Sequence, residues 1–204
     1  VLVDSRSSDQ TPDLARQFPN VRWLVRPFDT HAAQWQYGIG AADTDYVLAL
    51  DADYRVPAEF TSELARQFLP GGYSAGVAGF RYCIHGQPLR GSVYPAKVVV
   101  ARRDAVRITQ PGHSQVIAAE GTTYRFQARL SHDDRKPLQR FVRSQMEYAG
   151  LEADRLRRTP SARWQDRLRS TAVMPFVVGP GAYVAAGGPL AGWAAVQYAC
   201  ERTI

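Results

Sequence analysis

Cysteine is scarce in this chain, and repeated or low-complexity sequence is absent. The two cysteines, Cys83 and Cys200, lie far apart and lack the spacing of metal ligands. This argues against a disulfide framework and favours a reducing compartment. No internal repeat points to a solenoid or propeller, so the fold must be sought in the order of its individual helices and strands.

Acidic residues are outnumbered by basic ones, 19 to 25, which gives a net charge of +6. Such an excess fits a nucleic acid, an anionic membrane surface or a phosphorylated substrate. The composition, with 45% hydrophobic and 22% charged residues, is that of a globular chain rather than a disordered one. Its length allows one sizeable domain, with or without an appendage.

An apolar stretch at 46–50 ends in two aspartates, Asp51 and Asp53. Its lack of alternation predicts a short strand buried on both faces, as in parallel sheets. The two carboxylates would then lie at the C-terminal edge of the sheet, where open α/β sheets bind ligands, and on the same side of the chain. Such a pair suits Mg²⁺ or Mn²⁺, which bind through one or two carboxylates plus substrate phosphates. An acidic turn without a ligand is the alternative.

Strand and helix signals alternate before residue 54, which predicts a parallel α/β sheet in three layers. Thr11 is the expected N-cap of the first helix, with Pro12 at its first position. The patterns predict strands at 1–3, 21–25, 46–50, 76–84 and 97–101, a further apolar stretch at 124–130, and helices after Thr11, at 31–42, after Pro57 and from Pro137 to about 156.

A second acidic cluster follows the apolar stretch at 124–130. It contains His132, Asp133 and Asp134 and is followed directly by Arg135 and Lys136. The two basic side chains would face phosphate charge or lie in a solvated turn.

In the last third of the chain, an arginine-rich segment is followed by a long segment without charged residues. Six arginines and one acid lie between Arg155 and Arg169, and no charged residue occurs from Ser170 to Cys200. This run is long and apolar but is broken by proline and glycine, so it predicts a shallow or re-entrant segment at an anionic membrane surface. A Gly/Pro-rich tail packed on the domain is the alternative. We therefore expect a domain at 1–156, a membrane-associating segment at 157–204 and no nucleic-acid partner, because the arginines are not interleaved with aromatics.

The segment from Val3 to Thr11, followed by Leu48 to Asp53, resembles the donor-binding half of the inverting family 2 glycosyltransferases, which have the Rossmann-like GT-A fold. Further features are similar to bacterial membrane-associated transferases related to the lipopolysaccharide-core glucosyltransferases. These features are Gln34, Arg90 with Tyr94 and Pro95, Gly112 with His113, the run from His132 to Pro137, and the apolar C-terminal stretch.

The resemblance implies a site for a nucleoside diphosphate sugar. Asp4 would contact the base or ribose, Asp51 the ribose or a metal-bound water, and Asp53 would hold Mg²⁺ or Mn²⁺ on the diphosphate. The donor-binding residues implied in this way are Asp4, Ser7, Asp9, Asp51 and Arg90, and the metal ligands are Asp51, Asp53 and His132.

An inverting transfer needs a general base that takes a proton from the acceptor hydroxyl. Many relatives place an acidic residue where this chain has 112–115, and no carboxylate occupies that place here. His113 is one candidate, because imidazole titrates near neutral pH. Asp133 and Asp134 are the others, provided that burial or mutual proximity raises one pKa.

The implied activity is transfer of a sugar, with inversion, to a hydroxyl of a lipid-linked or cell-envelope glycan at the cytoplasmic face of the bacterial inner membrane. A haloacid-dehalogenase-like phosphatase is an alternative, since such enzymes also place Asp-x-Asp after a buried strand, although in the first strand. A non-catalytic membrane adaptor on a decayed transferase fold is another. The resemblance also leads us to expect a further strand, loop and helix ahead of Val1. The residues from Gln197 to Ile204 predict the start of a helix that stops without a cap, so we expect it to continue past Ile204.

Overall fold

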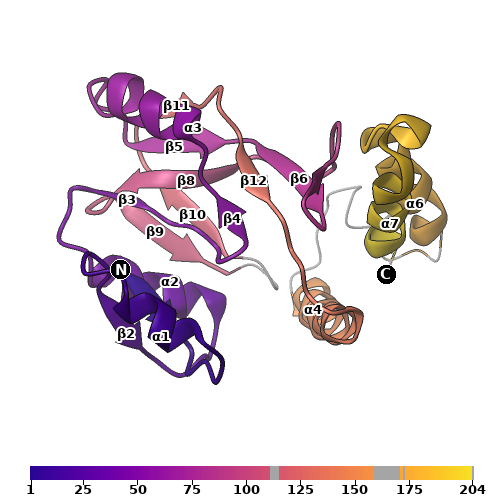
Figure 1. The fold of residues 1–204 in the computed structure, drawn as a ribbon, viewed down its shortest axis with the longest axis horizontal. Coiled ribbons are helices and arrows are strands. Elements are labelled where there is room, and N and C mark those ends of the chain that lie inside the picture. Colours follow the sequence, from indigo (N-terminus) through magenta and orange to yellow (C-terminus); the bar gives the residue numbers. More distant parts are fainter. Residues whose placement is uncertain (111–114, 159–170, 172, 204) are drawn as a thin grey trace. The chain divides into compact units, whose positions relative to one another are not determined.

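The computed structural model describes residues 1–110, 115–158, 171 and 173–203. Contacts divide the chain into two compact units. The first comprises 1–50, 72–77 and 98–124, and the second 51–71, 78–97 and 125–204. Figure 1 labels their helices and strands.

The first unit begins with the predicted alternation of strands and helices. Its elements are β1 (Leu2–Asp4), α1 (Thr11–Arg16), β2 (Trp23–Val25), α2 (His31–Gly40) and β3 (Tyr46–Leu48). β1 and β2 pair in parallel, with Val3 opposite Leu24, which confirms the expected crossover. The N-cap of α1 is Gln10 rather than Thr11, because the Asp9 carboxylate accepts the Thr11 N–H at 2.9 Å.

β3 differs from the doubly buried parallel strand that its sequence predicts. It pairs antiparallel with β8 (Lys97–Arg102), with Val47 opposite Ala101, and Val47 is its one buried residue. The sheet order is β11 (Thr123–Arg125), β5 (Ala75–Ala78), β8 and β3. A distant segment therefore sets the direction and burial of β3. β9 (Val106–Thr109) and β10 (Val116–Ala119) form an antiparallel pair that the sequence analysis missed, because each strand is only four residues long.

The second unit contains a four-stranded sheet in the order β4 (Tyr54–Arg55), β12 (Leu130–His132), β6 (Phe80–Ile84) and β7 (Gln87–Pro88). β12 runs antiparallel to β4 and parallel to β6. The predicted helix after Pro57 is α3 (Ala58–Glu63), which continues as a π-helical turn over Leu64–Phe68. The Glu63 carboxylate accepts the Gln127 and Ala128 N–H groups, both at 2.8 Å.

The described residues of the second unit also form the helices α4 (Leu138–Arg158), α6 (Met174–Ala185) and α7 (Gly192–Thr203). α4 confirms the predicted long helix, and it crosses the expected boundary between 156 and 157. α6 and α7 lie side by side and are joined through a 3-10 turn over Gly188–Ala191 (Figure 1). Their alanines and Tyr198 pack on Tyr82, Ile84 and Leu89. No helix in the described part of the chain is long and apolar enough to span a membrane.

Candidate active site

In the first unit, the loop after β1 is closed by Asp4. This buried carboxylate accepts the Ser7 N–H, at 3.1 Å to one oxygen, and the Ser7 hydroxyl. Arg6, between them, adopts a left-handed conformation with φ 66°. The structure thus brings together two of the residues implied for donor binding, at the C-terminal end of a parallel strand.

A buried amide fixes the position of this loop. Gln34 of α2 donates to the Ser5 hydroxyl at 2.8 Å and accepts from Arg26 at 2.7 Å. Arg26 also forms two hydrogen bonds with Asp29, which anchor the end of β2. Asp9, by contrast, faces the first turn of α1 through Thr11.

In the second unit, strand register brings Asp53 and His132 together. His132 lies opposite Tyr54 of β4 on one side and Tyr82 of β6 on the other. The Asp133 N–H donates to the Asp53 carbonyl at 3.1 Å, which extends the pairing by one residue. Asp53 Oδ2 then lies 3.1 Å from His132 Nε2. Two residues that are 79 positions apart thus form one polar pair.

The Asp53 carboxylate has two chemically different oxygens. Oδ2 faces His132, whereas Oδ1 is buried and has no hydrogen-bond partner among the described residues. His132 Nδ1 is likewise buried without a partner in the described chain. Burial raises the pKa of Asp53, but the hydrogen bond and charge of His132 and the charge of Lys136 outweigh it, so the pKa lies below its ordinary value.

Three tyrosines surround the imidazole of His132. The rings of Tyr54 and Tyr82 meet it edge-on, with centroids at 5.2 and 4.7 Å, and Tyr94 is tilted against it at 4.6 Å. We call these residues the tyrosine enclosure. It shields one side of the Asp53–His132 pair from water and fixes the orientation of the imidazole ring.

A chain of hydrogen bonds crosses the tyrosine enclosure. Tyr54 bonds to the Asp51 carboxylate and, at 2.7 Å, to the Tyr94 hydroxyl, which also accepts from Lys97 at 2.7 Å. Burial, followed by the Asp51 charge and the bond to Tyr94, raises the pKa of Tyr54 far above its usual value. Its hydroxyl is therefore neutral at physiological pH and able to donate.

The other acidic pair is engaged by basic groups. Asp133 accepts from the Gly86 N–H at 3.0 Å and from Arg135 at 2.7 Å. Burial raises the pKa of Asp133, but these two bonds outweigh it and the pKa is lowered. The raised pKa that we expected of a base is therefore not found at Asp133. Asp134 lies 2.8 Å from Lys136.

The remaining predicted residues are placed as follows. His113 lies outside the described residues. Arg90 lines a cavity with Arg81 and Arg129, and neither Asp51 nor Asp53 lines it. Within the described ranges, no three or more His, Cys, Asp or Glu side chains are arranged to hold a metal. The metal ligands named above therefore stay a prediction.

Sequence reasoning missed Tyr54 and Tyr82 as parts of the site. Tyr54 directly follows Asp53, so its position in the sequence offered a signal. Tyr82 offered none, because only the pairing of β6 with β12 places it beside His132.

In a mixed α/β fold, acidic groups at strand ends lie where such folds commonly bind ligands. Comparison with protein families finds a match to "Glycosyl transferase family 2" over residues 1–128, more than half of the 204 residues. The chain belongs to glycosyl transferase family 2 and is a glycosyltransferase that takes its sugar from a nucleotide donor. No curated protein matches the chain. The family match replaces the phosphatase alternative.

Proposed function

We propose that this glycosyltransferase transfers a sugar from a nucleoside diphosphate sugar, with inversion and with help from Mg²⁺ or Mn²⁺, to a hydroxyl of a lipid-linked or cell-envelope glycan. The observation that carries the proposal is the Asp53–His132 pair inside the tyrosine enclosure. Asp53 lies within the part of the chain that matches the family, and His132 lies beyond it.

The donor atoms of the pair fit a divalent cation. Asp53 Oδ1 is buried without a hydrogen-bond partner among the described residues, which costs free energy unless a ligand meets it. His132 faces this carboxylate through Nε2, 3.1 Å from Oδ2. Mg²⁺ and Mn²⁺ accept one or two protein ligands and complete their shell with substrate phosphates and water. Asp53, with His132, would hold the cation, which would neutralise the charge that develops on the leaving diphosphate.

The tyrosine enclosure supports the proposal through its hydroxyls and its ring faces. Burial raises the pKa of Tyr82 as well as that of Tyr54, so both hydroxyls remain protonated. Neutral tyrosines present an apolar ring face and a polar tip, a combination that suits a sugar with apolar and hydroxyl-bearing faces. Lys136 keeps its positive charge, because Asp134 raises its pKa more than burial lowers it.

The base for an inverting transfer remains among the three candidates of the sequence. A carboxylate with a lowered pKa is a weaker base near neutral pH, which argues against Asp133. His113→Ala should depress transfer far more than hydrolysis of the donor if His113 takes the acceptor proton.

We also propose that the enzyme works on the cytoplasmic face of the bacterial inner membrane. The support is an apolar surface on α6, the 3-10 turn and α7, in a stretch that carries no charge from Met174 to Ala199. Phe176 and Trp193 are 79% and 76% exposed. Large exposed apolar side chains beside an arginine-rich sequence are typical of a segment that lies in the interface of an anionic bilayer.

Thermal unfolding of the full chain with UDP, GDP and dTDP sugars, each with and without Mn²⁺, tests the donor assignment. One nucleotide class should raise the melting temperature, and Mn²⁺ should increase that shift, because a ligand that binds only the folded state stabilises it. A panel in which no nucleotide sugar changes the melting temperature would overturn the proposal.

A further inference from the structure

The second unit contains a cavity of about 310 Å³ whose charged lining residues are all arginines. They are Arg81, Arg90 and Arg129, and the aromatic residues Phe80 and Tyr82 contribute to the same wall. The arginines come from three segments: β6, the residues after β7, and the residue before β12.

These arginines lack a neutralising partner. None of the three forms an ion pair with a carboxylate in the described part of the chain, and no acid lines the cavity. All three arginines are exposed, and their positive charges around one cavity favour a bound anion over a cation. A guanidinium presents a planar fork of N–H donors, which matches the paired oxygens of a phosphate or a carboxylate.

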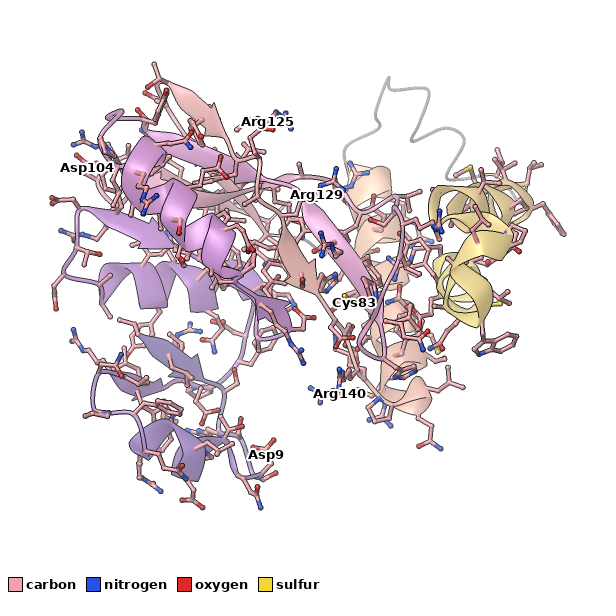
Figure 2. All side chains as sticks on the ribbon, turned by 45° about the horizontal axis from the view of Figure 1, so that its top comes forward. Asp9, Cys83, Asp104, Arg125, Arg129 and Arg140 are labelled. Atoms are coloured by element: carbon pink, nitrogen blue, oxygen red, sulfur yellow. The ribbon has the colours of Figure 1, made fainter. Side chains whose placement is uncertain are left out.

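Two of the arginines are held in place by backbone contacts. The Arg90 N–H donates to the Ala186 carbonyl at 3.2 Å, and its aliphatic stem lies so close to Gly187 that a Cβ there would be 2.9 Å away. The stem of Arg129, which Figure 2 labels, lies at ordinary contact distance from Gly79, 3.7 Å from the position of a Cβ there. These contacts restrict the stems of Arg90 and Arg129, although both residues remain exposed.

The cavity is adjacent to the candidate active site but distinct from it. Tyr82 lines the cavity, and its ring also contacts His132 at a centroid distance of 4.7 Å. Neither Asp53 nor His132 lines the cavity. Tyr82 is therefore shared by the cavity lining and the surroundings of the Asp53–His132 pair.

We propose that this cavity binds an oxyanion, a phosphate ester or a carboxylate, that belongs to the acceptor glycan. The inference rests on the proposed function, in which the donor diphosphate binds at the Asp53–His132 pair. Arg90 would then bind an anion of the acceptor, whereas the family resemblance implies that Arg90 binds the donor. Acceptors with a phosphate or carboxylate would be favoured over neutral glycans of the same size.

Equilibrium binding to the full chain tests this assignment with two probes, glucose 6-phosphate and methyl glucuronide, and methyl glucoside as the neutral reference. Arg81→Gln and Arg129→Gln should each weaken binding of at least one anionic probe by about tenfold or more, because bonds to charged groups are the stronger class. Arg140→Gln, which removes an exposed charge from α4, serves as the matched control and should leave binding unchanged (Figure 2). Nucleoside diphosphate binding is measured on the same samples.

Loss of the anionic probes with retained nucleotide binding supports the acceptor assignment, and the probe that is lost identifies the oxyanion. Equal probe binding by wild type and both cavity variants overturns it. Loss of nucleotide binding in Arg81→Gln and Arg129→Gln would also overturn it, because the cavity would then belong to the donor. If no nucleotide binds wild type while the probes still depend on the two arginines, the proposed function fails and the oxyanion site stands.

Discussion

Asp53 directly precedes β4 and Asp133 directly follows β12, and the two residues are neighbours in space. Their carboxylates nevertheless differ in burial and in hydrogen bonding. The Asp133 side chain is 3% exposed and its two oxygens accept from Gly86 and Arg135. The Asp53 side chain is 26% exposed, and one of its oxygens is buried without a partner among the described residues. A single backbone hydrogen bond, 3.1 Å long, joins the two residues.

This difference separates a structural carboxylate from a ligand-binding one. A buried acid whose oxygens are all engaged stabilises the fold and has no capacity left for a substrate. An acid with a buried, unpaired oxygen costs folding free energy, which a cation or a substrate would offset on binding. We therefore assign the binding role to Asp53 and expect Asp133 to position the loop that contains Gly86.

The largest expected effect is on turnover. Asp53→Asn should lower the rate of nucleoside diphosphate release from the donor by roughly a hundredfold or more, because loss of electrostatic stabilisation at a leaving group costs several kcal/mol. Release of the diphosphate into solution is measured with the best donor of the nucleotide panel, so that no acceptor is needed. Asp133→Asn is the matched control, and an equal loss in both variants would remove the distinction between the two acids.

The next effect is on stability. Asp133→Ala should lower the free energy of unfolding by about 1–3 kcal/mol, because the Gly86 N–H and Arg135 lose their acceptor. Urea titration of the full chain measures it. Asp154→Ala, which removes an exposed acid 3.7 Å from Arg157, should change the unfolding free energy by less than about 0.5 kcal/mol. If Asp133→Ala is as stable as this control, Asp133 does not hold the loop.

The apolar surface of α6, the 3-10 turn and α7 extends the comparison to apolar side chains, whose exposure to water also costs free energy. Leu190→Ser should weaken binding to vesicles that contain anionic lipid by up to about tenfold, since its side chain is 73% exposed and would enter the lipid. Leu14→Ser, at a 51% exposed position on α1, is the control. Co-sedimentation with vesicles gives the affinities, and equal values for the two variants would contradict the membrane proposal.

The local part of the fold was predictable from sequence, and the pairing of distant strands was not. The alternation from β1 to α2 follows from apolar spacing, from Pro12 and from the Thr30 cap, all of which act within a few residues. β3 looked doubly buried, but its antiparallel partner lies some fifty residues further on, which spacing alone does not reveal. Short apolar runs do not distinguish these cases.

In the candidate site, too, single residues were predictable from sequence but their pairing was not. Asp53 and His132 were each identifiable from their positions after apolar stretches, because acidic and imidazole groups at strand ends point to ligands. That they form one pair depends on the register of β12 between β4 and β6. The engagement of Asp133 by Gly86 depends on the same register, so sequence alone ranked Asp133 beside Asp134.

The most direct test of the account is whether Asp53 holds a cation on the donor diphosphate. Mn²⁺ is titrated into wild type, Asp53→Asn and Asp133→Asn, each saturated with the nucleoside diphosphate of the best donor, and free Mn²⁺ is followed by electron paramagnetic resonance. We predict that Asp53→Asn binds Mn²⁺ at least about tenfold more weakly than wild type, while Asp133→Asn is unchanged. Undiminished Mn²⁺ affinity in Asp53→Asn would contradict the account.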